Sequence, residues 1–93
     1  MKKDITQMRF FAAELRKELD KTAVEGCYCE VEAFEDNTDQ PKIKVRSSER
    51  NFDQCSLYCL DEVSEYCQAN ELHQYITVEQ LHSGTVIPVI IIF

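Results

Sequence analysis

The first periodic segment of the chain is an amphipathic stretch near the N-terminus. Asp4, followed three residues later by Gln7, is the pattern of a helix N-cap with its capping-box partner. Apolar residues then recur at spacings of three and four, the period of one helix face. They are Ile5, Met8, Ala12, Leu15 and Leu19. The pattern predicts a helix over residues 4–21, which ends before Gly26.

An alternating pattern follows and predicts a hairpin of two strands, residues 27–34 and 42–46, joined by turn-forming residues 36–41. One register satisfies both faces of this hairpin. It pairs Ala33 with Ile43 and Val31 with Val45 on one face, and Glu32 with Lys44 and Glu30 with Arg46 on the other. A slip by one residue would place acids opposite aliphatic side chains, so we expect this pairing.

A second helix is predicted over residues 51–69, with Asn51 as its N-cap and Gln54 three residues on. Its inward stripe consists of Phe52, Cys55, Cys59, Val63 and Tyr66, widened by Leu60 and Cys67. Residues 72–80 then return to strand-like alternation. A Ser83-Gly84 turn leads from them into a last strand, residues 85–93.

The element order is therefore α-β-β-α-β-β, and two similar capping patterns open the halves 4–47 and 51–93. We expect an α+β fold, a two-layer sandwich of tandem α-β-β units in a single domain, residues 1–93. Two helices would cover one face of a four-stranded, mainly antiparallel sheet, because every amphipathic element then buries its apolar side.

The last strand is unusual because residues 86–93 are apolar at every position. With a two-residue turn, Val78 pairs with Val89 and Ile76 with Ile91 on the helix side. Two interpretations of the far side remain open. Either the strand is central and its neighbours cover that side, or the hairpin presents a surface to a partner, most simply a second copy. Residues of that surface are Tyr75, Leu81, Val86, Ile90 and Ile92.

Pro88 favours the second interpretation, because proline cannot donate to a strand ladder and prefers an edge strand or a bulge. An all-apolar edge strand would need a partner to stay out of water. We therefore expect a homo-oligomer.

Charge changes the picture of possible partners. The net charge is -7, all ten Lys and Arg lie in residues 1–50, and residues 51–93 hold six acids and no base. Overall repulsion from phosphate disfavours nucleic acid and anionic membranes, so we expect neither as a partner. The acidic helix over residues 51–70 would instead suit a basic protein partner. Since there is no signal-peptide core and no membrane-length apolar run, we expect a cytoplasmic protein.

Candidate chemistry centres on five cysteines: Cys27, Cys29, Cys55, Cys59 and Cys67. An odd number without a secretory signal predicts thiols rather than a disulfide framework. Four of them could converge on zinc, but the spacings Cys-x-Cys and Cys-x3-Cys are not the usual Cys-x2-Cys knuckle, so we expect core packing. Neither His73 nor His82 is matched with an activated thiol, and no glycine-rich phosphate loop is present.

The sequence thus predicts no metal, no cofactor and no catalytic residue. The leading hypothesis is a non-enzymatic protein-interaction module that self-associates through its C-terminal hairpin. An alternative is a small acidic inhibitor or immunity-type protein that blocks a basic nucleic-acid-binding target. A weaker alternative is a metal or redox protein built on the cysteines.

Overall fold

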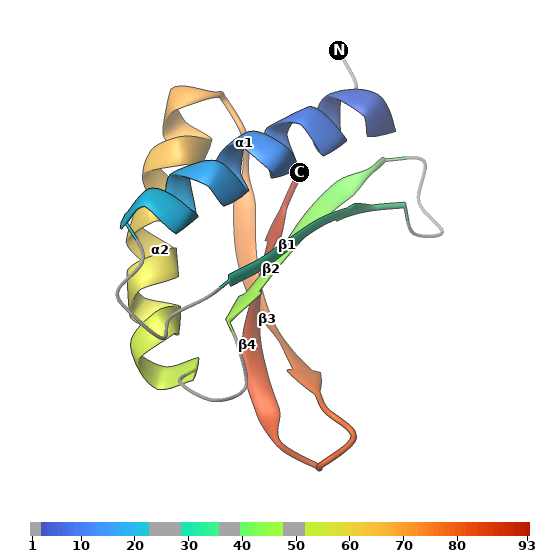
Figure 1. The fold of residues 1–93 in the computed structure, drawn as a ribbon. Coiled ribbons are helices and arrows are strands. Elements are labelled where there is room, and N and C mark those ends of the chain that lie inside the picture. The colour runs from blue at the N-terminus through green and yellow to red at the C-terminus, as the bar shows by residue number, and fades with distance from the viewer. Residues whose placement is uncertain (1–2, 23–28, 36–39, 48–51) are drawn as a thin grey trace.

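The structure, a computed structural model, describes the backbone of residues 3–22, 29–35, 40–47 and 52–93, with all of their side chains except those of residues 22, 47 and 52–60. Two helices and four strands follow the predicted αββαββ order (Figure 1). Their bounds are α1 Ile5–Thr22, β1 Cys29–Phe34, β2 Lys42–Ser47, α2 Phe52–Ala69, β3 Gln74–Gln80 and β4 Val86–Ile92. The α+β architecture expected from the sequence is confirmed.

Helix α1 begins with the predicted capping box. The Asp4 N–H donates to Gln7 Oε1 at 3.0 Å, and the Gln7 N–H donates to Asp4 Oδ1 at 2.8 Å. These two bonds satisfy backbone donors that have no partner within the first turn. Four residues of the predicted stripe, Met8, Ala12, Leu15 and Leu19, are buried, and Ile5 at its start is half-buried.

The strands form one antiparallel sheet in the order β1-β2-β4-β3, so β4 is central and β1 and β3 are the edges. Both helices lie on one face of this sheet, with α1 mainly over β1 and α2 over β2 and β4 (Figure 1). The register of the first hairpin is the predicted one, with Val31 opposite Val45 and Glu32 opposite Lys44. Alternation on both strands was therefore enough to specify that pairing.

The register of the second hairpin differs from the prediction by one residue. Its loop has three residues instead of two: the Leu81 N–H donates to the Thr85 carbonyl oxygen at 2.8 Å, and the Gly84 N–H to the Leu81 carbonyl oxygen at 2.9 Å. Gly84 has φ 91°, which suits the left-handed position that ends a three-residue loop. As a result Ile76 pairs with Ile90, and Val78 with Pro88.

The main core lies between the helices and the sheet. Val63 and Cys67 of α2 are buried there, as the helical stripe predicted, whereas the side chains of Phe52, Cys55, Cys59 and Leu60 lie outside the described residues. The sheet contributes buried residues from three strands. These are Cys29, Ile43, Val45, Ile90 and Ile92.

The opposite face of β4 is also covered. Ile87, Val89 and Ile91 are buried there, with Phe34 and Leu81 packed against them. On the same face Lys44 of β2 lies opposite Ile91 and Arg46 lies opposite Val89. Both bases reach across β4 to Glu79 of β3, which places an ion-paired cover over the aliphatic side chains of the central strand.

Two further expectations require correction. β4 is a central strand despite Pro88, because the β2 ladder on β4 ends at the pair Arg46–Val89, one residue before the proline. His73 and Phe93 exchange two backbone hydrogen bonds of 2.9 Å, which shows that the even-numbered residues of β4 direct their backbone groups toward β2. Pro88 therefore faces β2 one position after the last β2–β4 pair. Cys29 is not a free thiol; it is disulfide-bonded, and its partner lies outside the described side chains.

Candidate interaction surface

The C-terminal hairpin exposes three aliphatic side chains next to one another. Ile76 is 57 %, Val78 66 % and Val86 52 % exposed, which is far more than is usual for such residues. Ile76 pairs with the core residue Ile90, so this is the helix-facing side of the sheet. We call these three residues the hairpin patch.

Val78 and Val86 are exposed because the hairpin extends past the rest of the sheet, whereas Ile76 lies within the four-stranded part, on the edge strand β3 that the helices barely contact. Pairing of β4 with β2 ends at Val89, whereas pairing with β3 continues to Val86. In Figure 1 this distal part appears as a two-stranded arm below the other elements. Among the described residues, the helices contact mainly β1, β2 and β4. On the helix-facing side of β3, Gln74 donates to Ser64 Oγ of α2 at 2.6 Å, whereas Ile76 and Val78 stay exposed.

The backbone at the outer edge of β3 is also open. The hydrogen-bonded pair His73–Phe93 shows that the odd-numbered residues of β3 direct their N–H and C=O groups toward β4. Gln74, Ile76, Val78 and Gln80 therefore direct theirs outward. No strand of the described part of the chain pairs with this edge. Such an edge is a template for another strand.

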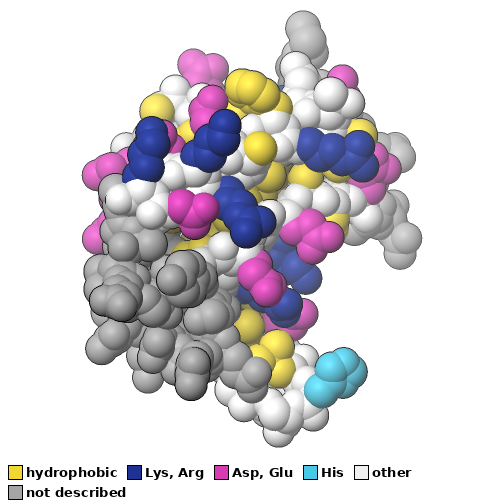
Figure 2. Space-filling model, in the orientation of Figure 1, with side chains coloured by type: hydrophobic (Ala, Val, Ile, Leu, Met, Phe, Trp, Pro, Cys, Tyr) yellow, Lys and Arg dark blue, Asp and Glu magenta, His cyan; other side chains and the backbone are white. Residues whose placement is uncertain are grey.

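The charges around β3 leave its edge neutral. Glu79 is the one charged residue of β3, and its carboxylate lies 3.6 Å from Lys44 Nζ and 3.5 Å from Arg46 Nη1 on the far face. Arg46 also donates to Glu30, a hydrogen bond that raises the pKa of the guanidinium. Figure 2 shows basic and acidic side chains interspersed over the middle of the face drawn. The opposite sheet edge, β1, carries Glu30 and Glu32.

The surface residues expected from the sequence are only partly brought together. Ile90 and Ile92 are buried in the core under the helices, so these two cannot contact a partner. The one-residue difference in register is the reason, because it turns them to the helix side. Tyr75 is exposed on the far face beside Phe93, and Leu81 is half-buried on the cluster of Ile87.

Val86 alone of the five lies in the hairpin patch. Sequence reasoning placed Ile76 and Val78 on the correct side of the sheet but expected the helices to cover them. The three-residue loop could have been suspected from Gly84, because glycine is the usual residue at the last position of such loops.

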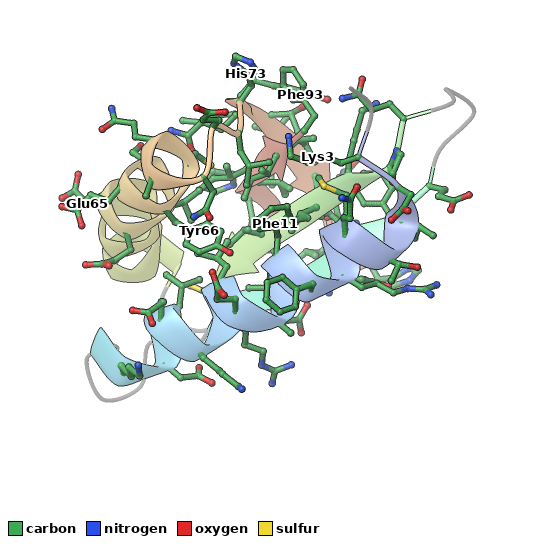
Figure 3. All side chains as sticks on the ribbon, turned by 90° about the horizontal axis from the view of Figure 1, so that it is seen from above. Lys3, Phe11, Glu65, Tyr66, His73 and Phe93 are labelled. Atoms are coloured by element: carbon green, nitrogen blue, oxygen red, sulfur yellow. The ribbon has the colours of Figure 1, made fainter. Side chains whose placement is uncertain are left out.

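A groove between the two helices gathers carboxylates. It is lined by Glu14 and Glu18 of α1 and by Glu62, Glu65, Tyr66 and Asn70 of α2. The Tyr66 hydroxyl donates to Glu14 Oε1 at 2.8 Å and lies toward Phe11, whereas Glu65 points outward (Figure 3). Burial, followed by this hydrogen bond, raises the pKa of Tyr66 well above its ordinary value. The acidic surface expected on the second helix is thus shared with α1.

The described residues offer little covalent chemistry. Cys67 is a free thiol, but it is buried, and burial raises its pKa to about 11, which disfavours the reactive thiolate. His73 stacks on Phe93 with ring centroids 5.5 Å apart (Figure 3). No group of three His, Cys, Asp or Glu side chains within the described ranges is placed to hold a metal ion.

Comparison of the chain with known protein families, characterised proteins and solved structures finds no match. Neither described helix combines the length and the apolar character needed to cross a membrane.

Proposed function

We propose that this chain is a non-enzymatic protein-interaction module whose copies associate through the C-terminal hairpin. The observation that carries the proposal is the hairpin patch lying beside an open, uncharged strand edge. Full burial of a valine or isoleucine side chain contributes roughly 1.5–3 kcal/mol relative to exposure. Burial of the hairpin patch therefore favours association, and hydrogen bonds along the open backbone edge would fix the orientation of the partner strand.

A second copy is the partner that fits the charges. Each chain carries a net charge of -7, so most of its surface repels an identical chain. At the β3 edge this repulsion is reduced, because Glu79, the one charged residue of β3, is paired within its own chain with Lys44 and Arg46. Identical edges can meet around a two-fold axis, which is the commonest symmetry of homodimers.

Sedimentation equilibrium at micromolar concentrations tests this proposal. We expect a dimer for the unchanged chain and a monomer for Val78→Lys, since a lysine there would place an unpaired charge in the contact. Both chains should have closely similar melting temperatures under conditions where they are monomeric, because position 78 is exposed.

Phe10→Lys is the matched control. Phe10 is 64 % exposed, as much as Val78, but lies on α1 away from the hairpin. This variant should remain dimeric. A monomeric unchanged chain, or equal loss of the dimer in both variants, would contradict the proposal.

A second candidate is favoured by the groove between the helices. Four glutamates from two helices line that groove and its rim, which suits a basic protein surface of the kind that binds nucleic acid. The chain would then act as a small acidic inhibitor, and reversing two charges with Glu62→Lys and Glu65→Lys should abolish capture of the basic protein while leaving the hairpin contact intact.

A further inference from the structure

We propose that two copies pair antiparallel along β3, about a two-fold axis at Thr77, so that their two sheets become one continuous sheet. This inference rests on the proposed self-association and specifies its geometry. The occupant of the open edge is thus the β3 strand of an identical chain, in a single register.

The sequence of β3 nearly reads the same in both directions. From residue 74 to residue 80 it is Gln-Tyr-Ile-Thr-Val-Glu-Gln, with Thr77 at the centre. Antiparallel pairing about Thr77 therefore sets similar or compatible side chains opposite one another. The pairs are Gln74 with Gln80, Tyr75 with Glu79, and Ile76 with Val78, each formed twice by symmetry.

The backbone favours the same register. In an antiparallel ladder, residues whose N–H and C=O groups face each other form pairs that exchange two hydrogen bonds. The outward-facing residues of β3 are Gln74, Ile76, Val78 and Gln80, and pairing about Thr77 uses all four. A shift by two residues leaves one of them without a partner, and a shift by one residue sets outward-facing groups against inward-facing ones.

The side chains gain from this register on both faces. On the helix-facing side, Ile76 and Val78 of each chain meet those of the other and form one aliphatic cluster from side chains that are more than half exposed in the single chain. On the far face each Glu79 lies opposite Tyr75 rather than the other Glu79. No like charges are set opposite each other.

A reciprocal pair of charges tests the register. Ile76→Lys and Val78→Glu should each weaken the dimer at least tenfold, measured by sedimentation equilibrium. Mixing the two variants should restore association as a heterodimer, since Lys at 76 then faces Glu at 78. The double variant Ile76→Lys/Val78→Glu should form a homodimer, because each of its lysines faces a glutamate of the other copy.

The matched control shifts the acid by two residues. In Ile76→Lys/Gln80→Glu the opposite charges would meet only in a shifted register, so this variant should stay monomeric. Circular dichroism melting of every variant checks that the fold is kept, as positions 76, 78 and 80 are exposed.

The outcomes separate the two proposals. A monomeric unchanged chain would overturn both. If Val78→Lys dissociates the dimer, self-association through the hairpin is supported. The register would nevertheless be wrong if the double variant Ile76→Lys/Val78→Glu were monomeric, or if the control Ile76→Lys/Gln80→Glu were dimeric.

Discussion

At the residue scale, Cys67 shows how burial changes the chemistry of a side chain. The sequence presents five cysteines without distinction, yet the structure gives Cys29 a disulfide and leaves Cys67 a covered thiol whose pKa is raised to about 11. Helical spacing predicted the burial of Cys67, because it lies four residues after the core residue Val63. The disulfide was not predicted, since pairing depends on where strands and helices meet.

The raised pKa of Cys67 makes stability depend on pH. The pKa of an unfolded cysteine thiol is about 8.5, and burial raises the pKa of the folded Cys67 thiol to about 11, so the folded chain holds this proton more tightly. The resulting stabilisation is complete below about pH 8.5 and is lost as the pH rises through about 11. We expect the free energy of unfolding, measured with urea, to fall by at most about 3 kcal/mol over this range.

Cys67→Ala provides the comparison. It removes the thiol but leaves Tyr66, whose raised pKa contributes a loss in the same direction at higher pH. The variant should therefore lose less stability than the unchanged chain between pH 8 and pH 11. Identical pH profiles would show that the Cys67 thiol does not titrate as its burial implies.

At the element scale, the far face of β4 depends on the long side chains that cover it. Arg46 lies opposite Val89 and pairs with both Glu30 and Glu79. Exposed ion pairs typically contribute only about 0.2–1 kcal/mol, but the aliphatic part of an arginine also keeps water from the apolar groups beneath it. We therefore expect the carbon atoms of the Arg46 side chain, as well as its charge, to stabilise this face of β4.

Two substitutions at position 46 separate these contributions. Arg46→Met keeps an apolar stem of similar length, whereas Arg46→Ala removes both the stem and the charge. We expect the alanine variant to lose about 1 kcal/mol more stability than the methionine variant in urea unfolding. Equal losses would mean that the ion pairs, rather than the covering stem, stabilise this face.

The two hairpins also differ in how far their sequences predict them. In the first hairpin both strands alternate, so one register satisfies aliphatic pairs such as Val31–Val45 and ion pairs such as Glu30–Arg46 at once. In the second, β4 is apolar at every position and gains equally from either face. The loop ending at Gly84 then decides the register, and a single added residue reverses which side chains of β4 reach the core.

At the scale of the whole molecule, charge sets how association responds to salt. Two chains of net charge -7 repel each other, while the proposed contact itself is neutral. The Debye length falls from about 10 Å at 0.1 M to about 3 Å at 1 M, so salt screens this repulsion. We expect the dimer to tighten several-fold between about 50 mM and about 500 mM sodium chloride.

A complex formed through the acidic groove should respond in the opposite direction. Its attraction is Coulombic and comes from Glu14, Glu18, Glu62 and Glu65, so salt would weaken it. Sedimentation across the salt series thus separates the two candidate functions. A dimer that weakens as salt rises would argue against the neutral β3 contact.

The sequence predicted the element order and the side of the sheet that holds the core, because periodicity reports which face of each element is apolar. It did not predict how much of that side two helices can cover. Ile76 and Ile90 belong to the same face, yet only Ile90 is buried. Which strands the helices bury depends on where the helices lie across the twisted sheet, and the alternation of residues along a strand does not specify that position.

Pro88 has a consequence for how many chains can join. Beyond the last β2–β4 pair, Arg46–Val89, the arm has a second edge, and there Pro88 offers no N–H to an incoming strand. At the far end of the sheet Glu30 is paired with Arg46, so the exposed carboxylate of Glu32 is the charge of β1 that opposes the addition of another acidic chain. If two β3 strands pair as proposed, we therefore expect growth to stop at a closed pair instead of continuing into a fibre.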